Sequence, residues 1–298
     1  MTQTAVKVRG LAKRYGEVRA VDGIDLEIGT GEVFAILGPN GAGKSTTVEI
    51  LEGYRQRDAG EVSVLGTDPG HPTRLWRSRV GIVLQTANDT AELTVRETIR
   101  HFAGYYPQAR DPDALIEKVG LTDKADKRIR QLSGGQRRRV DVALGVVGNP
   151  EVLFLDEPTT GFDPEARRRF WVLIQDLAQE GTTIVLTTHY LDEAEALADR
   201  VAVITKGRVV AEGPPATLGG RAVAKAQVSW LEEGERKQLQ TGTPTRTVVE
   251  LTRRFDGEVP ELTVTRPSLE DIYLDLIGSS STEPDDHSPA ASRSRDPR

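Results

Sequence analysis

The residues from Gly38 to Thr46 have the types and spacing needed to hold a phosphate group. Gly38, Gly43, Lys44 and Ser45 satisfy the pattern G-x-x-x-x-G-K-[ST], between a short apolar run and a segment with helical periodicity. Glycines let the backbone curl so that its N–H groups and the start of a helix face an anion. In this pattern the lysine reaches the β- and γ-phosphates of a nucleotide, and the serine hydroxyl binds magnesium. The alternative is a glycine-rich turn beside an exposed lysine. The residues expected to contact the phosphates are Gly38, Pro39, Asn40, Gly41, Ala42, Gly43, Lys44, Ser45 and Thr46.

Two acidic residues, Asp156 and Glu157, directly follow an apolar run at 152–155. A buried strand that ends in Asp156 places a carboxylate beside the magnesium ion, as in other phosphate-loop proteins. Glu157 is then placed to polarise a water molecule in line with the γ-phosphate. Acidic pairs are common at strand ends, so this signal is strong only in combination with the phosphate loop. Together the two motifs predict binding of a nucleoside triphosphate and magnesium.

A third motif, LSGGQ, occupies residues 132–136 between the two phosphate motifs. Taken alone, a serine followed by two glycines is a helix cap, but its hydroxyl and N–H groups also suit a γ-phosphate. With this motif the chain resembles the ATP-binding subunit of an ATP-binding-cassette (ABC) transporter. The resemblance implies ATP and Mg²⁺ as the bound groups, and it implies that this motif covers the ATP of a second subunit. The residues that would make this contact are Ser133, Gly134, Gly135 and Gln136.

The same resemblance implies roles at further positions. Tyr15 matches the aromatic residue that stacks on adenine, and Gln85 matches the glutamine that contacts magnesium. Asp163, in GFDP, matches the loop that crosses to the partner subunit, although Phe162 replaces the family's usual leucine. His189 lies just after an apolar run and matches the histidine that contacts the γ-phosphate and holds the attacking water. The implied magnesium ligands are Ser45, Gln85 and Asp156, and the implied catalytic residues are Glu157, His189 and Lys44.

Without the resemblance, these positions have ordinary structural explanations. Tyr15 would be an edge-strand tyrosine, Gln85 a surface glutamine and His189 a structural histidine at a strand end. The combination of all the motifs favours the functional interpretation.

Short apolar runs typical of buried strands alternate with helical stretches along the chain. Such alternation indicates a mostly parallel sheet covered by helices. We therefore predict an α/β phosphate-loop NTPase (RecA-like) core with a mixed sheet. The runs are at 33–37, 62–64, 80–84, 152–155, 183–186 and 201–204.

Changes in composition divide the chain into four parts. Residues 1–87 and 151–215 are expected to form the ATP-binding core, and 88–150 an inserted helical subdomain that carries LSGGQ. A turn-rich linker then leads to a small α+β C-terminal appendage at 216–277, which includes an apolar helix face behind Ser268. The Ser-, Pro- and Asp-rich tail at 278–298 is predicted to be disordered.

Composition excludes several classes of function. The chain of 298 residues has 39 basic and 45 acidic residues and a formal charge of −6, which argues against nucleic-acid binding by bulk electrostatics. It contains no cysteine, so thiolate catalysis and cysteine-ligated metals are excluded. No apolar run approaches the roughly 18 residues that a membrane span needs. These features predict a soluble protein with no nucleic-acid partner.

The resemblance also implies two protein partners. A single cassette in the chain implies a homodimer that encloses two ATP molecules, and the absence of a span implies a separate membrane permease. The permease is expected to dock on the helical insert, where Leu93, Phe102, Tyr105 and Tyr106 offer apolar surface. The protein would then lie at the cytoplasmic face of the membrane, as a peripheral subunit.

The segment PSLEDIYLDLIG at 267–278 resembles the C-terminal signature of exporter ATPases of the daunorubicin-resistance type. This favours export of a hydrophobic drug or lipid. Three alternatives remain open at this stage: a cytosolic ATPase that acts as a nucleotide switch, a scaffold that binds without hydrolysing, and the ATPase of an importer.

Overall fold

A six-stranded mixed sheet forms the centre of the protein, whose computed structural model describes residues 3–83 and 92–280. Its order is β5-β6-β7-β3-β8-β9, with parallel pairing as far as β8 and an antiparallel edge pair β8–β9. The predicted α/β fold with a mixed sheet is thereby confirmed. The strands are β3 (Val33–Leu37), β5 (Val80–Val83), β6 (Val152–Asp156), β7 (Thr183–Thr188), β8 (Arg200–Thr205) and β9 (Arg208–Gly213).

The central strands are apolar along their whole length because both faces of the sheet are covered. All five residues of β3 are buried, and they alternate between two hydrophobic clusters. Val33, Ala35 and Leu37 face the first cluster, whereas Phe34 and Ile36 face the second. This two-sided burial explains why the strands could be recognised in the sequence as uninterrupted apolar runs.

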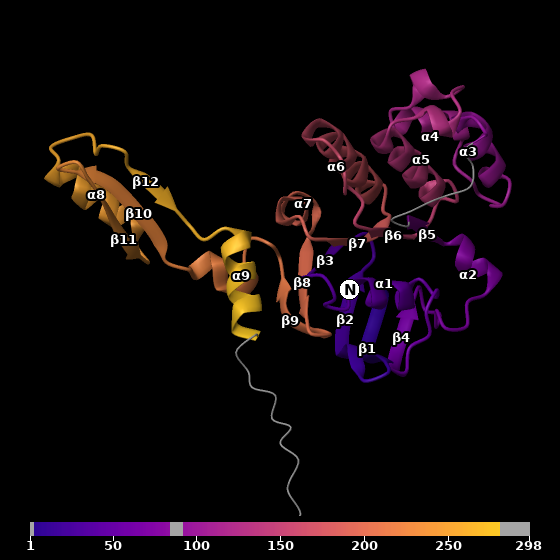
Figure 1. Cartoon of the computed structure of the whole chain (residues 1–298), viewed down its shortest axis with the longest axis horizontal. Helices are drawn as coiled ribbons and strands as arrows, with labels where there is room; N and C mark the ends of the chain where they lie inside the picture. Colours follow the sequence, from indigo (N-terminus) through magenta and orange to yellow (C-terminus); the bar gives the residue numbers. More distant parts are fainter. Residues whose placement is uncertain (1–2, 84–91, 281–298) are drawn as a thin grey trace, which may run out of the picture.

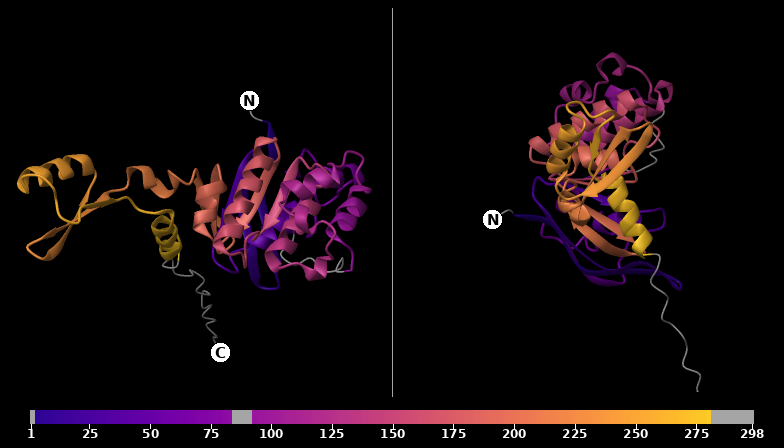
Figure 2. Two further views of the ribbon diagram at one scale, coloured as in Figure 1. Left: turned by 90° about the horizontal axis from the view of Figure 1, so that it is seen from above. Right: turned by 90° about the vertical axis from the view of Figure 1, so that its left-hand side faces the viewer.

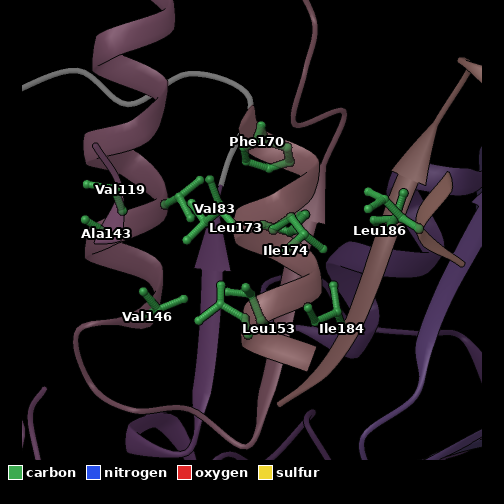
Figure 3. Close-up of a cluster of buried hydrophobic side chains, with 14 of the residues drawn as sticks. Val83, Val119, Ala143, Val146, Leu153, Phe170, Leu173, Ile174, Ile184 and Leu186 are labelled. Atoms are coloured by element: carbon green, nitrogen blue, oxygen red, sulfur yellow. The ribbon is translucent and has the colours of Figure 1, made fainter. Parts of the chain in front are cut away.

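Helices cover the first face of the sheet. Figure 3 shows side chains of α5 (Gly134–Val146) and α6 (Pro164–Gln179) meeting those of β5, β6 and β7. Beside them lie α7 (Leu191–Leu197) and the inserted helices α3 (Val95–Ala103) and α4 (Pro112–Lys118), as Figure 1 shows. A capping box starts α3, with Thr94 and Glu97 bonded reciprocally.

A second, antiparallel sheet and helix α1 (Lys44–Leu51) contribute to the cluster on the other face. The strand order of this second sheet is β2-β1-β4. Helix α2 (Arg74–Ser78) contributes Trp76 to the same cluster. The long strands β1 and β2 were not among the predicted apolar runs, because each has one face exposed and its buried residues are separated by charged ones. The three strands are β1 (Thr4–Tyr15), β2 (Val18–Gly29) and β4 (Ala59–Val64).

The C-terminal appendage projects away from the core, as Figure 2 shows. Its antiparallel sheet has the order β11-β10-β12, and α8 packs on β10 through Val228, Trp230 and Leu251. The segment η3 (Leu218–Val223) connects the core to this sheet. The elements of the appendage are β10 (Ala226–Glu232), β11 (Glu235–Thr241), α8 (Pro244–Arg254) and β12 (Thr263–Thr265).

Helix α9 (Leu269–Ser280) returns to the core instead of sealing the appendage. Leu269 is completely buried in the first hydrophobic cluster, and Tyr273 and Leu276 pack against that cluster. The helix contacts η3, α7 and β8. This placement differs from the expectation that α9 belongs to the appendage, because an apolar helix face in a sequence does not reveal which surface it covers.

Gln85 and residues 281–298 of the predicted tail lie outside the described residues. Within 3–83 and 92–280, no helix is long and apolar enough to cross a membrane.

The packing of α9 can be tested by truncating Leu269. We expect Leu269→Ala to lower the free energy of unfolding by about 2–5 kcal/mol, because it leaves a cavity in the core. Leu274→Ala is the matched control on the same helix, since Leu274 is 57% exposed. Urea denaturation of both variants measures the difference, and equal losses would contradict the observed orientation of α9.

Candidate ATP-binding and hydrolysis site

Parallel pairing brings the predicted site residues to one edge of the sheet. Strand β7 pairs with β3 so that Leu37 is opposite Thr188, and with β6 so that Asp156 is opposite Thr187. The three strands therefore end side by side. The loop that follows β3, the acidic pair at the end of β6 and His189 after β7 all leave the sheet at this edge, where ligands bind in open α/β sheets.

The phosphate loop is shaped by close backbone approaches. A Cβ atom at Gly43 would lie 2.2 Å from the carbonyl oxygen of Ala20, and one at Gly38 would lie 2.2 Å from that of Ile204. Gly43 also has a φ of +103°, which L side chains rarely adopt. Helix α1 begins directly after Gly43, so its free N–H groups face the space enclosed by the loop.

Lys44 closes the loop with its own side chain. Its Nζ donates to the carbonyl oxygens of Gly38 and Pro39, at 2.7 and 3.1 Å. Burial lowers the pKa of Lys44, whereas the negative charges of Glu157 and Asp156 raise it. The ammonium group is thus held over the loop and near both acidic side chains. Ser45 and Asn40 are exposed and Thr46 is half-buried.

Thr187 holds both acidic residues at the end of β6. Its hydroxyl donates to the Asp156 carboxylate at 2.5 Å and accepts from the backbone N–H of Glu157 at 3.1 Å. Glu157 has a φ of +43°, in the left-handed region that is sparsely populated for residues with a side chain. Such backbone strain is found at sites where a side chain must be aimed, and here it directs the Glu157 carboxylate away from the strand.

His189 lies against the Glu157 carboxylate. The distance from its Nδ1 to Glu157 Oε1 is 3.3 Å, and the hydroxyl of Thr160 donates to the other oxygen at 3.3 Å. The ring of His189 is 4.1 Å from that of Tyr190, which in turn lies beneath the guanidinium group of Arg167. The histidine side chain is 41% exposed and the glutamate side chain 19% exposed, so both can meet a molecule from solution.

The LSGGQ motif forms the start of α5. The Ser133 hydroxyl accepts from the backbone N–H of Gln136, and the Gln136 side chain accepts from that of Ser133. Ser133 and Gly134 are exposed, and Gly135 is half-buried. Among the hydrogen bonds of the described residues, none joins this motif to the phosphate loop of the same chain.

Tyr15 and Asp163 are both exposed. The guanidinium group of Arg55 lies 5.3 Å from the centre of the Tyr15 ring, which is 41% exposed. The Asp163 carboxylate caps α6 by accepting from Ala166 N–H at 2.8 Å. Phe162, where the family pattern has leucine, packs edge-on against Phe170 at 5.8 Å and is accommodated in the core.

Several known proteins are similar to this chain. A family model described as "ABC transporter" matches residues 21–160. The daunorubicin resistance ATP-binding protein DrrA3 of Streptomyces coeruleorubidus is 37% identical to this chain, over 93% of this chain and 97% of the relative. The chain belongs to the ABC transporter family of ATP-binding subunits. The Nod factor export ATP-binding protein I of Rhizobium sp. (strain N33) is also 37% identical, over 93% and 98% of the two chains.

Solved ABC cassettes have the same fold. The dimeric post-hydrolysis state of the cassette MJ0796, bound to ADP and Pi, matches with a TM-score of 0.64 and 27% identity. The match covers 70% of this chain and 98% of that one. The resemblance inferred from the motifs is confirmed, and this ABC subunit is an ATPase of the same kind.

Three residues of the ABC site were missed in the sequence. Thr187 and Thr160 hold the acidic pair, and Arg138 is a buried arginine on α5 that donates to the carbonyl oxygens of Asp156 and Pro158, at 2.8 and 3.1 Å. Arg138 thereby fastens the helix that starts with LSGGQ to the acidic strand end. Its position in the RRR run that follows LSGGQ was the only signal, and exposure cannot be inferred from such a run.

The oxygen ligands available near the loop suit magnesium. Mg²⁺ prefers hard oxygen donors and is held in such sites by one or two protein groups together with phosphate oxygens. Asp156 supplies a carboxylate and Ser45 an exposed hydroxyl, whereas Gln85 lies outside the described residues. Within the ranges that the structure describes, no cluster of three or more acidic, histidine or cysteine side chains could hold a metal without the nucleotide.

The shape of the loop predicts that replacing two of its glycines by alanine weakens ATP binding to different extents. Gly41 and Gly43 both have a positive φ, but a Cβ at Gly41 meets no atom within 4 Å. Gly41→Ala should therefore weaken ATP binding by about 5- to 30-fold, which corresponds to the backbone strain alone. Gly43→Ala should weaken it by about 10²-fold or more, since the loop must move to relieve the overlap. Titration with a fluorescent ATP analogue compares them, and equal affinities would refute this account of the loop.

Proposed function

We propose that Glu157, His189 and Lys44 carry out ATP hydrolysis in this subunit. The observation that carries the proposal is the contact of His189 with the Glu157 carboxylate at the edge where the phosphate loop opens. Glu157 acts as the general base toward water, since its second oxygen is near the exposed surface. His189 orients the water and the γ-phosphate, and Lys44 neutralises charge on the β- and γ-phosphates.

Magnesium fits this proposal. Ser45, Asp156 and Gln85 would hold it, and when bound it supplies positive charge to the β- and γ-phosphate oxygens. Asp156 is prepared for this role because the hydroxyl of Thr187 orients its carboxylate.

We infer that two copies of the chain share the ATP sites. The contacts to ATP proposed for Ser133, Gly134, Gly135 and Gln136 need a second subunit, because these residues are exposed or half-buried and no hydrogen bond of the described residues joins them to the phosphate loop of the same chain. Asp163 lies at the start of α6 close to the same edge and would cross to the partner. Closure around ATP excludes water and completes the site, and hydrolysis allows it to reopen.

A membrane permease is the proposed partner for this motion. A cavity of about 400 Å³ lies between the proposed core units, 1–87 and 151–215, and the proposed helical subdomain, 88–150. Trp76 and Ile82 line it from one side, and Tyr106 and Leu144 from the other.

Large apolar side chains are exposed in and beside this cavity: Tyr54 in its lining, and Leu75 and Tyr105 in the adjoining groove, are 62–77% exposed. Leu93 is also exposed, and Phe102 is half-buried against the core. Exposed apolar patches of this kind are typical of protein interfaces. The subunit would thus dock at the cytoplasmic face of the membrane.

We further propose that the transported molecule is a hydrophobic drug or a lipid. Two relatives that the chain spans almost completely are named for daunorubicin resistance and for Nod factor export. The match to both continues through the C-terminal appendage, because it covers 93% of this chain.

The proposed general base can be tested by Glu157→Gln. This change keeps the size of the side chain but removes the proton acceptor, so we expect ATP turnover to fall by about 10²-fold or more. ATP binding should be retained, and the ATP-bound dimer should persist. Phosphate release measures turnover, and size-exclusion chromatography measures the dimer.

Glu165→Gln is the control for this experiment, because Glu165 is 78% exposed on α6 and forms an exposed ion pair with Arg169. It should hydrolyse ATP at the wild-type rate. If Glu157→Gln did the same, Glu157 would not be the base.

The partner can be identified with the Glu157→Gln chain, tagged and incubated with ATP. We expect affinity purification from gently solubilised native membranes to recover a polytopic membrane protein in near-equal amount, identified by mass spectrometry. Tyr105→Glu, in the exposed apolar surface, should greatly reduce the recovery without changing ATP binding. Recovery of ribosomal or DNA-binding proteins without a membrane protein would overturn the transporter proposal and indicate a cytosolic switch.

A further inference from the structure

A buried carboxylate lies between the turn that carries His189 and the loop that carries Asp163. Glu193, on α7, is completely buried, although an acidic side chain is rarely enclosed without a partner. It lies one helical turn after His189. The proposed mechanism gives Glu193 no role, so its burial needs another explanation.

The groups around Glu193 complement it. Among the described residues, neither carboxylate oxygen has a hydrogen-bond partner, and the same is true of three buried groups: the Thr159 hydroxyl, the Trp171 indole N–H and the Arg167 Nε. Burial raises the pKa of Glu193, whereas the hydroxyls of Thr188 and Thr159, the Trp171 N–H and the Arg167 charge lower it. These groups come from α6, from the loop before α6 and from the end of β7, and they favour the charged form of the carboxylate.

Thr188 connects this cluster to His189. Its hydroxyl accepts from the backbone N–H of Tyr190 at 3.0 Å, so it fixes the turn that has His189 at its centre. The hydroxyl of Thr188 also favours the charged form of Glu193, since it lowers the pKa of that carboxyl. Thr188 and Glu193 are both completely buried, one at the end of the strand before His189 and the other on the helix after it.

Thr159 and Trp171 connect the cluster to the loop on the other side. The carbonyl oxygen of Thr159 accepts from the N–H of Phe162 at 3.0 Å, directly before Asp163. Trp171 lies on α6, which starts at Pro164. Helices α6 and α7 are also joined by a hydrogen bond, which the side-chain Nε2 of Gln175 donates to the carbonyl oxygen of Ala196 at 3.1 Å.

We propose that Glu193 is a positioning residue for ATP hydrolysis. It holds the Thr188–Tyr190 turn, and with it His189, in a fixed position relative to the loop that contains Thr159. The Glu193 carboxylate does not touch the nucleotide. It orients His189 so that the imidazole meets the Glu157 carboxylate, and it transmits displacement of the Asp163 loop to that contact. The inference rests on the role proposed above for His189.

The test compares Glu193→Gln with Glu195→Gln in the full chain. Glu195 is on the same helix but is partly exposed and paired with Arg221, so its replacement should leave turnover unchanged. Glu193→Gln keeps the size of the side chain but presents an amide NH₂ to the surrounding donors. We expect kcat to fall at least tenfold while the KM and Kd for ATP change less than twofold.

A double-mutant cycle with His189→Ala separates positioning from a general loss of structure. If Glu193 acts through His189, Glu193→Gln should cost less than twofold in the His189→Ala background, measured by single-turnover hydrolysis of labelled ATP. A full tenfold loss in that background, or a wild-type kcat for the single variant, would overturn the proposal. Parallel loss of ATP binding and thermal stability would also overturn it, since that indicates a structural role alone.

Trp171→Phe provides a second route if Glu193→Gln does not fold. It removes one donor with little change of volume, and it should lower kcat in the same selective way, about threefold or more. The proposed role of His189 fails separately, if His189→Ala itself hydrolyses ATP at the wild-type rate. If His189→Ala is impaired while Glu193→Gln and Trp171→Phe are normal, only the inference about Glu193 fails.

Discussion

The pairing of β6 with β7 is the constraint on which the site depends. Because Asp156 and Thr187 are opposite each other in this parallel pair, one hydroxyl can hold the Asp156 carboxylate and the Glu157 N–H at once. A shift of one residue would turn these side chains to the other face of the sheet. The alternation of β3, β6 and β7 between two hydrophobic clusters prevents such a shift. The packing of the core therefore determines where the Asp156 and Glu157 side chains lie.

The elements around this edge connect parts of the chain that are distant in sequence. Arg138 joins the helix of the LSGGQ motif to the end of β6, and Lys44 joins the start of α1 to the loop before it. Each side chain donates to backbone carbonyl oxygens at this edge of the sheet, and removing either donor would remove these hydrogen bonds at an energetic cost. Arg138 therefore links α5 directly to the end of β6.

Much of this arrangement could be predicted from the sequence, and the reasons differ from element to element. The phosphate loop and the strands beside it were predicted because glycine geometry and two-sided burial leave strong patterns, as in 33–37 and 38–46. Thr187, Thr160 and Glu193 were not, since a threonine or glutamate has the same appearance in a sequence whether it is buried or exposed. Strands β1 and β2 were missed because the predicted strands were uninterrupted apolar runs, whereas here buried apolar residues alternate with exposed charged ones, as in 24–28.

The return of α9 to the core has a mechanical consequence for the appendage. The chain leaves the core through η3 and comes back through α9, and these two segments contact each other. The C-terminal sheet is thus fastened by two neighbouring stalks instead of one tether (Figure 1). Two attachments resist twisting that a single linker would permit. A load applied to the sheet would pass through Leu269 and through the ion pair of Arg221 with Glu195 into α7, the helix that follows His189.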